Sequence, residues 1–143
     1  MTVIPDPVAL TQALIRCPSV TPAEAGVLDR LQAELEAIGF ACRRMPFSEP
    51  GTPDVDNLWA RRGTGRPHFC FAGHTDVVPV GQRDQWRFDP FAGEVRDGQV
   101  WGRGASDMKC AIAAFTAAAA RFLAARGPGF AGSISLLVTG DEE

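Results

Sequence analysis

Apolar residues recur at helical spacing in two stretches near the start of the chain. The first stretch follows Asp6, a typical N-cap residue, and stops before Pro18, which cannot continue a helix. The second stretch carries one apolar stripe, made of Val27, Leu28, Leu31, Leu35 and Ile38. Residues 21–24 (TPAE) supply an N-cap, a first-turn proline and a capping-box acid, and Gly39 is typical of a helix end. We therefore expect a short helix and a longer one that begins at Pro22.

Shorter apolar runs, separated by glycine and proline, predict strands. Three of them cover residues 40–45, 57–62 and 68–72. The third, HFCFA, is nearly all apolar, so we expect it at the centre of a sheet. Residues 93–104 surround Asp97-Gly98, a dipeptide that supplies the positive φ angles of a tight hairpin turn. This segment predicts a β-hairpin.

The last part of the chain combines a long helical pattern with a final strand. From Ser106 to Gly127 the sequence is rich in alanine, and larger apolar residues recur every three or four positions. Residues 133–139 (SISLLVT) form an apolar, β-branched run, which predicts a buried parallel strand. Helices, strands, a long helix and a strand in this order predict an α/β fold, with a mixed, largely parallel sheet flanked by helices.

The composition is that of an ordinary globular protein, with 45% hydrophobic and 22% charged residues among 143. This length favours one folding unit. Fourteen basic against 17 acidic side chains give a net charge of −3, so we expect neither a nucleic-acid partner nor a polybasic membrane anchor. No stretch approaches the roughly 20 apolar residues of a membrane span, and no leader pattern is visible, so we expect a cytoplasmic protein. The four cysteines lack a CxxC pattern, which predicts reduced, mostly buried thiols.

Polar side chains gather just beyond the predicted strands, where open α/β sheets place their binding sites. His74 and Asp76 follow the HFCFA strand, and because they lie two residues apart in an extended chain, their side chains share a face. The Asp76 carboxylate can then accept a hydrogen bond from the imidazole, which fixes the tautomer of a metal-binding histidine. A solvated loop histidine beside an acid is the alternative that this pair alone leaves open.

Three further acids lie at comparable places. Asp107 precedes the long helix, where it either ligates a metal or complements the positive end of the helix dipole. Glu142 and Glu143 follow the last strand, and neighbours in extended backbone point in opposite directions, so they need not share a role. One carboxylate of this pair can bind a metal while the other takes a proton from water. A solvated turn is the alternative.

Taken together, one imidazole and several carboxylates at neighbouring strand ends suit a divalent metal. Two such ions about 3.5 to 4 Å apart can share one bridging carboxylate. They polarise a carbonyl and lower the pKa of bound water, so that a nearby carboxylate takes its proton at neutral pH. The cluster therefore predicts metal-assisted hydrolysis of an amide.

Four spaced motifs extend this prediction. They are GHTDVVPVG from Gly73, WRFDPF at 86–91, GRGASDMK from Gly102 and VTGDEE at 138–143. In this order they resemble the co-catalytic zinc aminoacylase and carboxypeptidase family, and NLWARRG from Asn57 adds to the likeness. The resemblance implies a zinc-exopeptidase-like catalytic domain. It also implies two Zn²⁺ per subunit, with Co²⁺ commonly accepted, and a homodimer for the full-length enzyme.

The resemblance also assigns roles to individual residues. It implies that His74 ligates one zinc, that Asp107 bridges both ions and that Glu143 ligates the other. Asp76 then orients His74, and Glu142 is the general base that activates water. The implied substrate is a small molecule, the succinyl amide of diaminopimelate, which is cleaved to succinate and the free diamino acid. Deacetylation of acetylornithine or of another acylated amino acid is the alternative within the family.

Two features depart from the family pattern. Cys110 stands where glycine is usual, and we expect it to be a small packed side chain. Family members continue beyond the acidic pair with further ligands and a dimerisation domain, so residues 1–143 are expected to be the N-terminal part of an incomplete catalytic domain. We therefore expect this chain alone to bind zinc weakly and to hydrolyse nothing at a useful rate. A non-catalytic, truncated α/β module is the alternative from another class.

Overall fold

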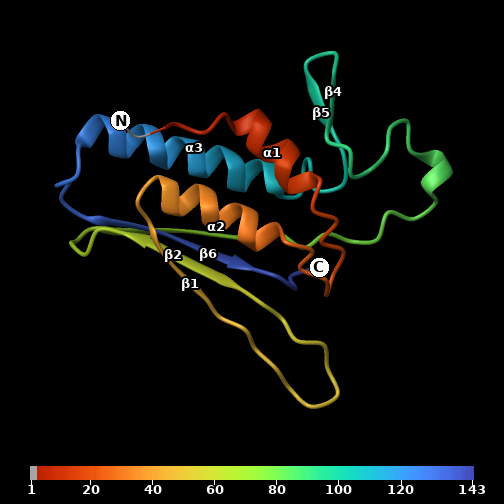
Figure 1. Cartoon of the computed structure of the whole chain (residues 1–143), viewed down its shortest axis with the longest axis horizontal. Coiled ribbons are helices and arrows are strands. Elements are labelled where there is room, and N and C mark those ends of the chain that lie inside the picture. The colour runs from red at the N-terminus through yellow and green to blue at the C-terminus, as the bar shows by residue number, and fades with distance from the viewer. Residues whose placement is uncertain (1–2) are drawn as a thin grey trace.

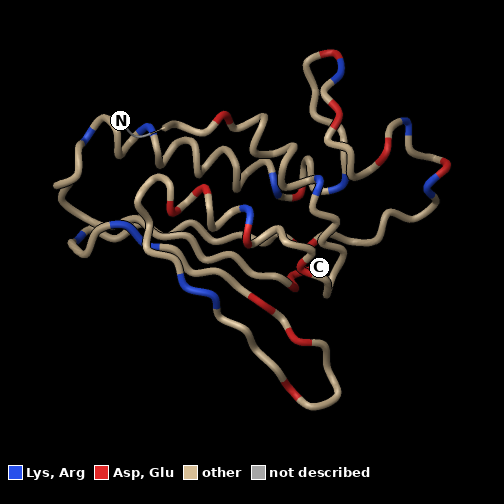
Figure 2. Tube along the Cα trace, in the orientation of Figure 1, with Lys and Arg blue, Asp and Glu red and all other residues tan. Residues whose placement is uncertain are grey.

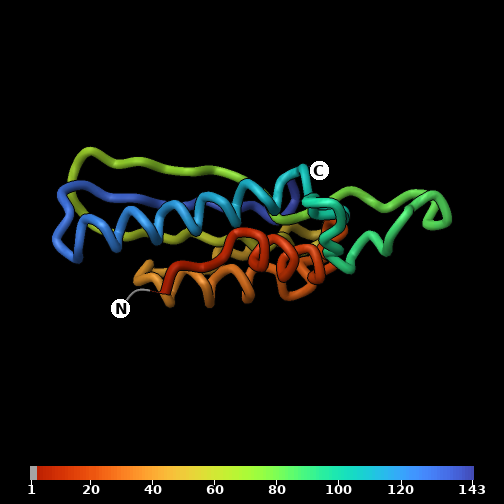
Figure 3. Tube along the Cα trace, turned by 90° about the horizontal axis from the view of Figure 1, so that it is seen from above, coloured from red at the N-terminus to blue at the C-terminus, as the bar shows by residue number. Residues whose placement is uncertain are grey.

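The computed structural model describes residues 3–143 and shows three helices packed on one face of a four-stranded sheet (Figure 1). Helix α2 lies against strands β1 and β2, α3 lies against β3, and α1 packs on the other two helices. Seen from above, the helices form a layer beside the sheet (Figure 3). The predicted α/β class with a mixed sheet and packed helices is confirmed. Within the described residues, none of the helices combines the length and apolarity that crossing a bilayer requires.

The helices agree with the predicted pattern except at the starts of the second and third. Helix α1 covers Pro7–Ile15 and is capped by Asp6, whose carboxylate accepts the N–H of Val8 at 2.9 Å. Helix α2 covers Val27–Ala37 and α3 covers Lys109–Arg126. The expectation that the second helix begins at Pro22 is wrong, since residues 21–26 precede the helix, with turns at 21–22 and 25–26. The reason is that Glu24 caps the helix from outside, with its carboxylate accepting the N–H groups of Gly26 and Leu28.

The main sheet has the strand order β1-β2-β6-β3. Its strands are β1 (Ala41–Arg44), β2 (Leu58–Arg62), β3 (His68–His74) and β6 (Ser133–Thr139). Strand β2 runs antiparallel to both neighbours, and only β3 and β6 are parallel. The parallel part is therefore smaller than predicted, because β6 inserts between β2 and β3 and runs against β2.

The position of β3 corrects a second expectation. HFCFA was expected at the centre of the sheet, but among the described residues β3 pairs only with β6 and forms an edge. Within residues 3–143, no second strand pairs along its other side. Instead Phe71 stacks on Phe115 of α3, with ring centroids 4.5 Å apart, while Phe69 is 60% exposed. An apolar run therefore predicted the strand but not its place in the sheet.

A separate hairpin confirms the prediction made from Asp97-Gly98. Strands β4 (Glu94–Arg96) and β5 (Gln99–Trp101) pair antiparallel, and Asp97 and Gly98 have φ angles of 53° and 74°. A short 3-10 helix, η1 (Arg83–Gln85), precedes this hairpin. Both features stand away from the sheet (Figure 1).

The core lies between the helices and one face of the sheet. It includes Leu14, Leu28, Leu31, Leu35, Leu58, Ile112, Leu136 and Val138. All four cysteines are free, as expected, but the expectation of mostly buried thiols is wrong. Cys17, Cys42 and Cys110 are half-buried and Cys70 is exposed. Cys70 is exposed because side chains alternate along β3, and its side chain lies on the sheet face on which no helix packs within residues 3–143.

The parallel pairing of β3 and β6 positions the chemistry. His74 lies opposite Thr139 in the register, so the segments that follow the two strands leave the sheet side by side. The N–H of Thr75 continues the ladder to the carbonyl of Thr139 at 3.1 Å. The start of α3 reaches the same end of the molecule, where the C-terminus also lies (Figures 1 and 3). The acidic residues 141–143 lie at the C-terminus, at this end of the molecule (Figure 2).

Candidate metal centre

His74 is the last residue of β3 and is 5% exposed. Its Nδ1 lies 3.0 Å from the main-chain oxygen of Asp76 and 3.4 Å from the carboxylate Oδ1 of the same residue. The hydrogen bond is therefore made to the main chain, and the Asp76 side chain lies beside the ring rather than accepting from it at close range. With Nδ1 donating to that carbonyl, Nε2 is the nitrogen that faces outward.

Three carboxylates surround this outward nitrogen. Asp107 Oδ1 lies 3.2 Å from Nε2 and Glu142 Oε2 lies 3.7 Å from it. Ligand atoms of His74, Glu142 and Glu143 all lie within 4.8 Å of one another. The structure thus brings His74 together with both residues of the acid pair. Asp107 joins this cluster through its contact with His74.

Asp76 holds the backbone of the acidic segment, residues 141–143. It is 2% exposed, and its Oδ2 accepts the main-chain N–H groups of both Glu142 and Glu143 at 2.9 Å. Its Oδ1 is buried without a hydrogen-bond partner, so it faces the His74 ring alone. A single buried carboxylate therefore orders the acid pair and borders the imidazole.

Two residues outside the predicted set also hold the acidic segment. Asn57, 7% exposed, accepts the N–H of Gly140 at 3.2 Å and donates to the carbonyl of Met45 at 3.1 Å. Thr21 donates its hydroxyl proton to the carboxylate of Asp141. Asn57 stood in the NLWARRG motif, whose polar first residue before a strand was the available signal for it. No local pattern marked Thr21, since TPAE predicted a helix cap.

Asp107 lies in the turn before α3, as expected from its place ahead of the long helix. Its side chain is 74% exposed, so solvent reaches the carboxylate that contacts His74. The next helical residue, Lys109, is fully buried at 0% exposure. This burial excludes direct contact of the Lys109 ammonium with a substrate.

Charge and burial shift the titration of two groups here. Burial lowers the pKa of His74, but the hydrogen bonds to the Asp76 carbonyl and the Asp107 carboxylate, with the charges of Asp76 and Glu142, outweigh it and raise the pKa above its usual value. Burial lowers the pKa of Lys109 to about 8, against the opposing attraction of Cys17 and Asp76. The His74 cluster is thus an acidic environment that favours a cation at Nε2.

The donor set fits a divalent metal ion. An imidazole nitrogen with carboxylate oxygens is the ligand chemistry of zinc and cobalt sites, in which metal–ligand distances are about 2.0 to 2.2 Å. Donor atoms spread over 4.8 Å approach such a sphere after small rotations of the two glutamates, whose side chains are exposed. The hydrogen bond from Nδ1 to the Asp76 carbonyl is the usual arrangement that orients a histidine ligand, and the negative charge of the Asp76 carboxylate lies beside the same ring.

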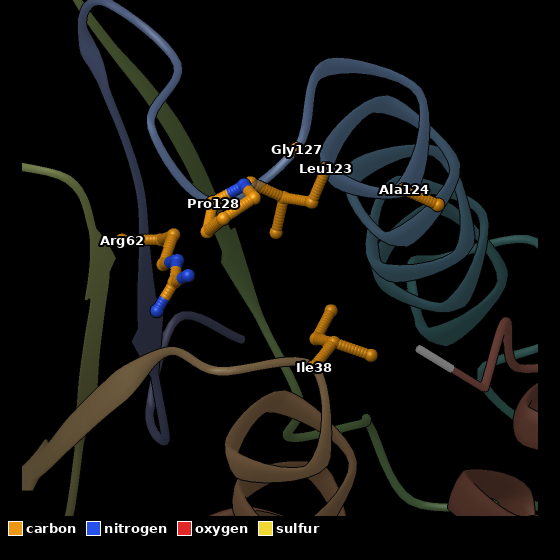
Figure 4. A pocket seen from close by; sticks show the side chains of 6 residues that line it. All are labelled: Ile38, Arg62, Leu123, Ala124, Gly127 and Pro128. Carbon is orange, nitrogen blue, oxygen red and sulfur yellow. The ribbon is translucent and has the colours of Figure 1, made fainter. Parts of the chain in front are cut away.

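Two cavities differ in their relation to this cluster. One, of about 280 Å³, adjoins it and is lined by Asp107, Glu143, Ser106, Arg103, Gly102, Gly104 and Val78. The other, of about 230 Å³, lies between the C-terminal end of α3 and the end of α2, where Ile38 and Leu123 face each other and Arg62 is the only charged residue (Figure 4). Only the first has the acidic lining that a metal-dependent reaction needs.

Comparison with known proteins decides the family. The model of peptidase family M20/M25/M40 matches residues 70–143, which include His74, Asp107 and both glutamates. The chain belongs to peptidase family M20/M25/M40. The resemblance seen in the four motifs is thereby confirmed. Membership of this M20 family implies dependence on a metal.

Curated relatives extend the match across nearly the whole chain. It is 64% identical over 139 residues to the succinyl-diaminopimelate desuccinylase of Rhodospirillum centenum, covering 97% of this chain and 36% of the relative. It is 62% identical over 138 residues to the protein of the same name from Parvibaculum lavamentivorans, covering 96% of this chain and 34% of the relative. The chain thus spans about a third of the length of the M20 relatives that it matches.

Solved structures agree with the fold. Human carnosine dipeptidase 1 is 25% identical with a TM-score of 0.75, over 95% of this chain and 32% of that one. An M20 family metallo-carboxypeptidase from Sulfolobus solfataricus is 18% identical with a TM-score of 0.75, over 95% of this chain and 31% of that one. The likeness to the second structure shows the fold alone, which is the M20 arrangement of helices on a mixed sheet.

Proposed function

We propose that this chain is the N-terminal part of the catalytic domain of a dinuclear zinc amide hydrolase. Its reaction is the hydrolysis of N-succinyl-LL-diaminopimelate to succinate and LL-diaminopimelate. The observation that carries the proposal is the 56–64% identity, over 94% or more of the chain, to relatives named for that desuccinylation. The cluster of His74, Asp107, Glu142 and Glu143 at one end of the sheet supports it.

The roles proposed for the residues follow from their positions. His74, through Nε2, would hold one zinc, Glu143 would hold the second, and Asp107 would serve as a ligand to both. Asp76 orients His74 from behind. Zinc, or cobalt in its place, polarises the amide carbonyl and lowers the pKa of bound water when it is present.

Glu142 is proposed as the general base. Its side chain is 61% exposed and reaches within 3.7 Å of His74 Nε2, so it borders the centre from the solvent side. In this role it takes a proton from the attacking water and returns it to the leaving nitrogen. The two hydrogen bonds from main-chain N–H groups to Asp76 fix the backbone of the acid pair beside His74.

The proposal extends to the metabolic role, the compartment and the oligomeric state of the longer protein. Release of the free diamino acid places the enzyme in diaminopimelate and lysine biosynthesis, and we assign the longer protein to the cytoplasm as a homodimer. Residues beyond the length of this chain would supply the remaining ligands, the contacts to the succinyl group and the dimerisation domain.

A chimera tests this proposal. Residues 1–143 replace the matching segment of the Rhodospirillum centenum relative, and the purified chimera is assayed with succinyl and acetyl amides after chelation and restoration of zinc or cobalt. We expect metal-dependent hydrolysis of the succinyl amide, whereas the 143-residue chain alone gives no turnover and binds zinc weakly. An inactive chimera beside an active parent enzyme would contradict the hydrolase. Activity on the acetyl amide alone would contradict the substrate.

A further inference from the structure

Lys109 is the only lysine of the chain; the other 13 basic residues are arginines. It is also completely buried, with 0% exposure, at the first position of α3. An ammonium group in a protein interior is costly unless it is hydrogen-bonded. The lysine head is a compact point charge with three donors, so it can serve two neighbouring carbonyl groups.

The ammonium ties α3 to the end of α1. Its Nζ donates to the carbonyl of Leu14 at 2.9 Å and to the carbonyl of Cys17 at 2.8 Å. The last carbonyls of a helix have no N–H partner within it and carry the negative end of its dipole. Lys109 thus links segments that are more than 90 residues apart in the chain.

The loop that carries Asp107 folds over the stem of the same lysine. The Lys109 N–H donates to the carbonyl of Gly104 at 3.0 Å, and Gly104 has a φ of 86°. A Cβ added to Gly104 would lie 2.9 Å from Lys109 Cδ and 3.1 Å from Val77 Cγ1. Glycine is required there because the backbone lies directly against the lysine stem.

We propose that Lys109 is a positioning residue, which sets the place of Asp107 against His74 by anchoring the first turn of α3 to the end of α1. The inference rests on the proposed function, because the metal centre is what requires Asp107 at that place. The Asp107 side chain is 74% exposed and meets the cluster only at its 3.2 Å contact with His74. The position of Asp107 is therefore set by the backbone of residues 104–109, which Lys109 anchors to the end of α1.

The test uses the full 143-residue chain with Lys109→Met, which keeps the stem and removes the charge. Leu123→Ala is the matched control, since it removes packing at the opposite end of α3 (Figure 4). Hydrogen exchange measures the backbone of residues 104–110, and visible absorption during a Co²⁺ titration into the millimolar range measures metal binding. Gly104→Ala, which leaves the ammonium and displaces the loop, is used if Lys109→Met does not fold.

We expect Lys109→Met to speed exchange in residues 104–110 and to weaken Co²⁺ binding about tenfold or more, as loss of a ligand-supporting contact does. Leu123→Ala should lower stability and leave the Co²⁺ affinity unchanged. Equal affinities for wild type and Lys109→Met, or equal losses in both variants, would overturn the proposal. A wild-type chain without Co²⁺ absorption counts against the proposed function instead, and unchanged exchange in Lys109→Met then still overturns the anchoring role.

Discussion

Asp76 and Glu143 lie 67 residues apart in the chain, and the Oδ2 atom of Asp76 accepts the main-chain N–H of Glu143 at 2.9 Å. The same oxygen accepts the N–H of Glu142 at the same distance. The residue that borders the proposed histidine ligand therefore also orders the two proposed acids. One buried carboxylate couples the end of β3 to the end of β6.

Asp76→Asn tests this coupling. The amide keeps the shape of the side chain but removes the negative charge from the group that accepts two N–H groups. Hydrogen bonds to a charged group contribute about 1.5 to 3 kcal/mol each to stability. We expect a loss of about 2 kcal/mol or more in the free energy of unfolding in urea, with Co²⁺ affinity lower by about 10- to 100-fold. Asp54→Asn, at an exposed loop position, is the control and should change neither. Equal behaviour of both variants would argue against the coupling.

Glu142 and Glu143 are predicted to separate into base and ligand. In the chimera, Glu142→Gln should lower kcat by about 10² to 10⁴ while the bound metal per protein stays the same, because only proton transfer is lost. Glu143→Gln should instead lower the metal content at a fixed free metal concentration. Since both side chains lie in the group with His74, the reverse result is physically possible and would exchange the two assignments.

Cys42 predicts a pH dependence of stability away from the metal centre. Burial, followed by the charge of Glu36, raises the pKa of this thiol from 9.0 to about 11. The folded chain then holds the proton more tightly than the unfolded chain, so the contribution to stability is complete below pH 9 and is lost as the pH rises toward 11. Under reducing conditions, wild type should lose more stability than Cys42→Ala between these values. A parallel pH dependence of the two proteins would contradict the shift.

The free edge of β3 predicts self-association at high concentration. Phe69 is 60% exposed on a strand that pairs only with β6 within residues 3–143, and an exposed apolar edge favours pairing with another chain. Light scattering should show a rise in mass with concentration for wild type and a constant mass for Phe69→Lys. Phe47→Lys is the control, since Phe47 is 63% exposed but lies outside the sheet, in an isolated β-bridge with Val55. The prediction is wrong if wild type stays monomeric or if both variants suppress association.

Much of the fold can be predicted from the sequence where a structure depends on neighbouring residues. Asp6 begins α1, and Asp97-Gly98 forms the hairpin turn, because these residues act on their own neighbours. The place of HFCFA could not be predicted, since an apolar run predicts a buried strand, whereas within residues 3–143 this strand is an edge on which Phe69 and Cys70 are exposed. The TPAE segment led to a wrong helix start. Glu24 caps α2 from a turn before the helix, and the spacing of the residues is the same as in a first helical turn.

The site shows the same division. The sequence placed His74, Asp107, Glu142 and Glu143 at strand and helix ends, and the parallel pairing of β3 and β6 brings those ends together. The long-range supports, Asn57 to Gly140 and Lys109 to Leu14, depend on contacts 83 and 95 residues apart. A signal for Lys109 was nevertheless present: it lies on the same helical stripe as buried Ile112, Ala113 and Thr116, where a lysine needs a partner.

Anomalous diffraction at the zinc edge, from crystals of this chain soaked in Zn²⁺, tests the proposed metal centre most directly. The account predicts a peak about 2.0 to 2.2 Å from His74 Nε2 and from a carboxylate of the cluster, with Nδ1 still bonded to the Asp76 carbonyl. Zinc bound only elsewhere, such as at the exposed His68 and Cys70, with no density beside His74, would contradict it.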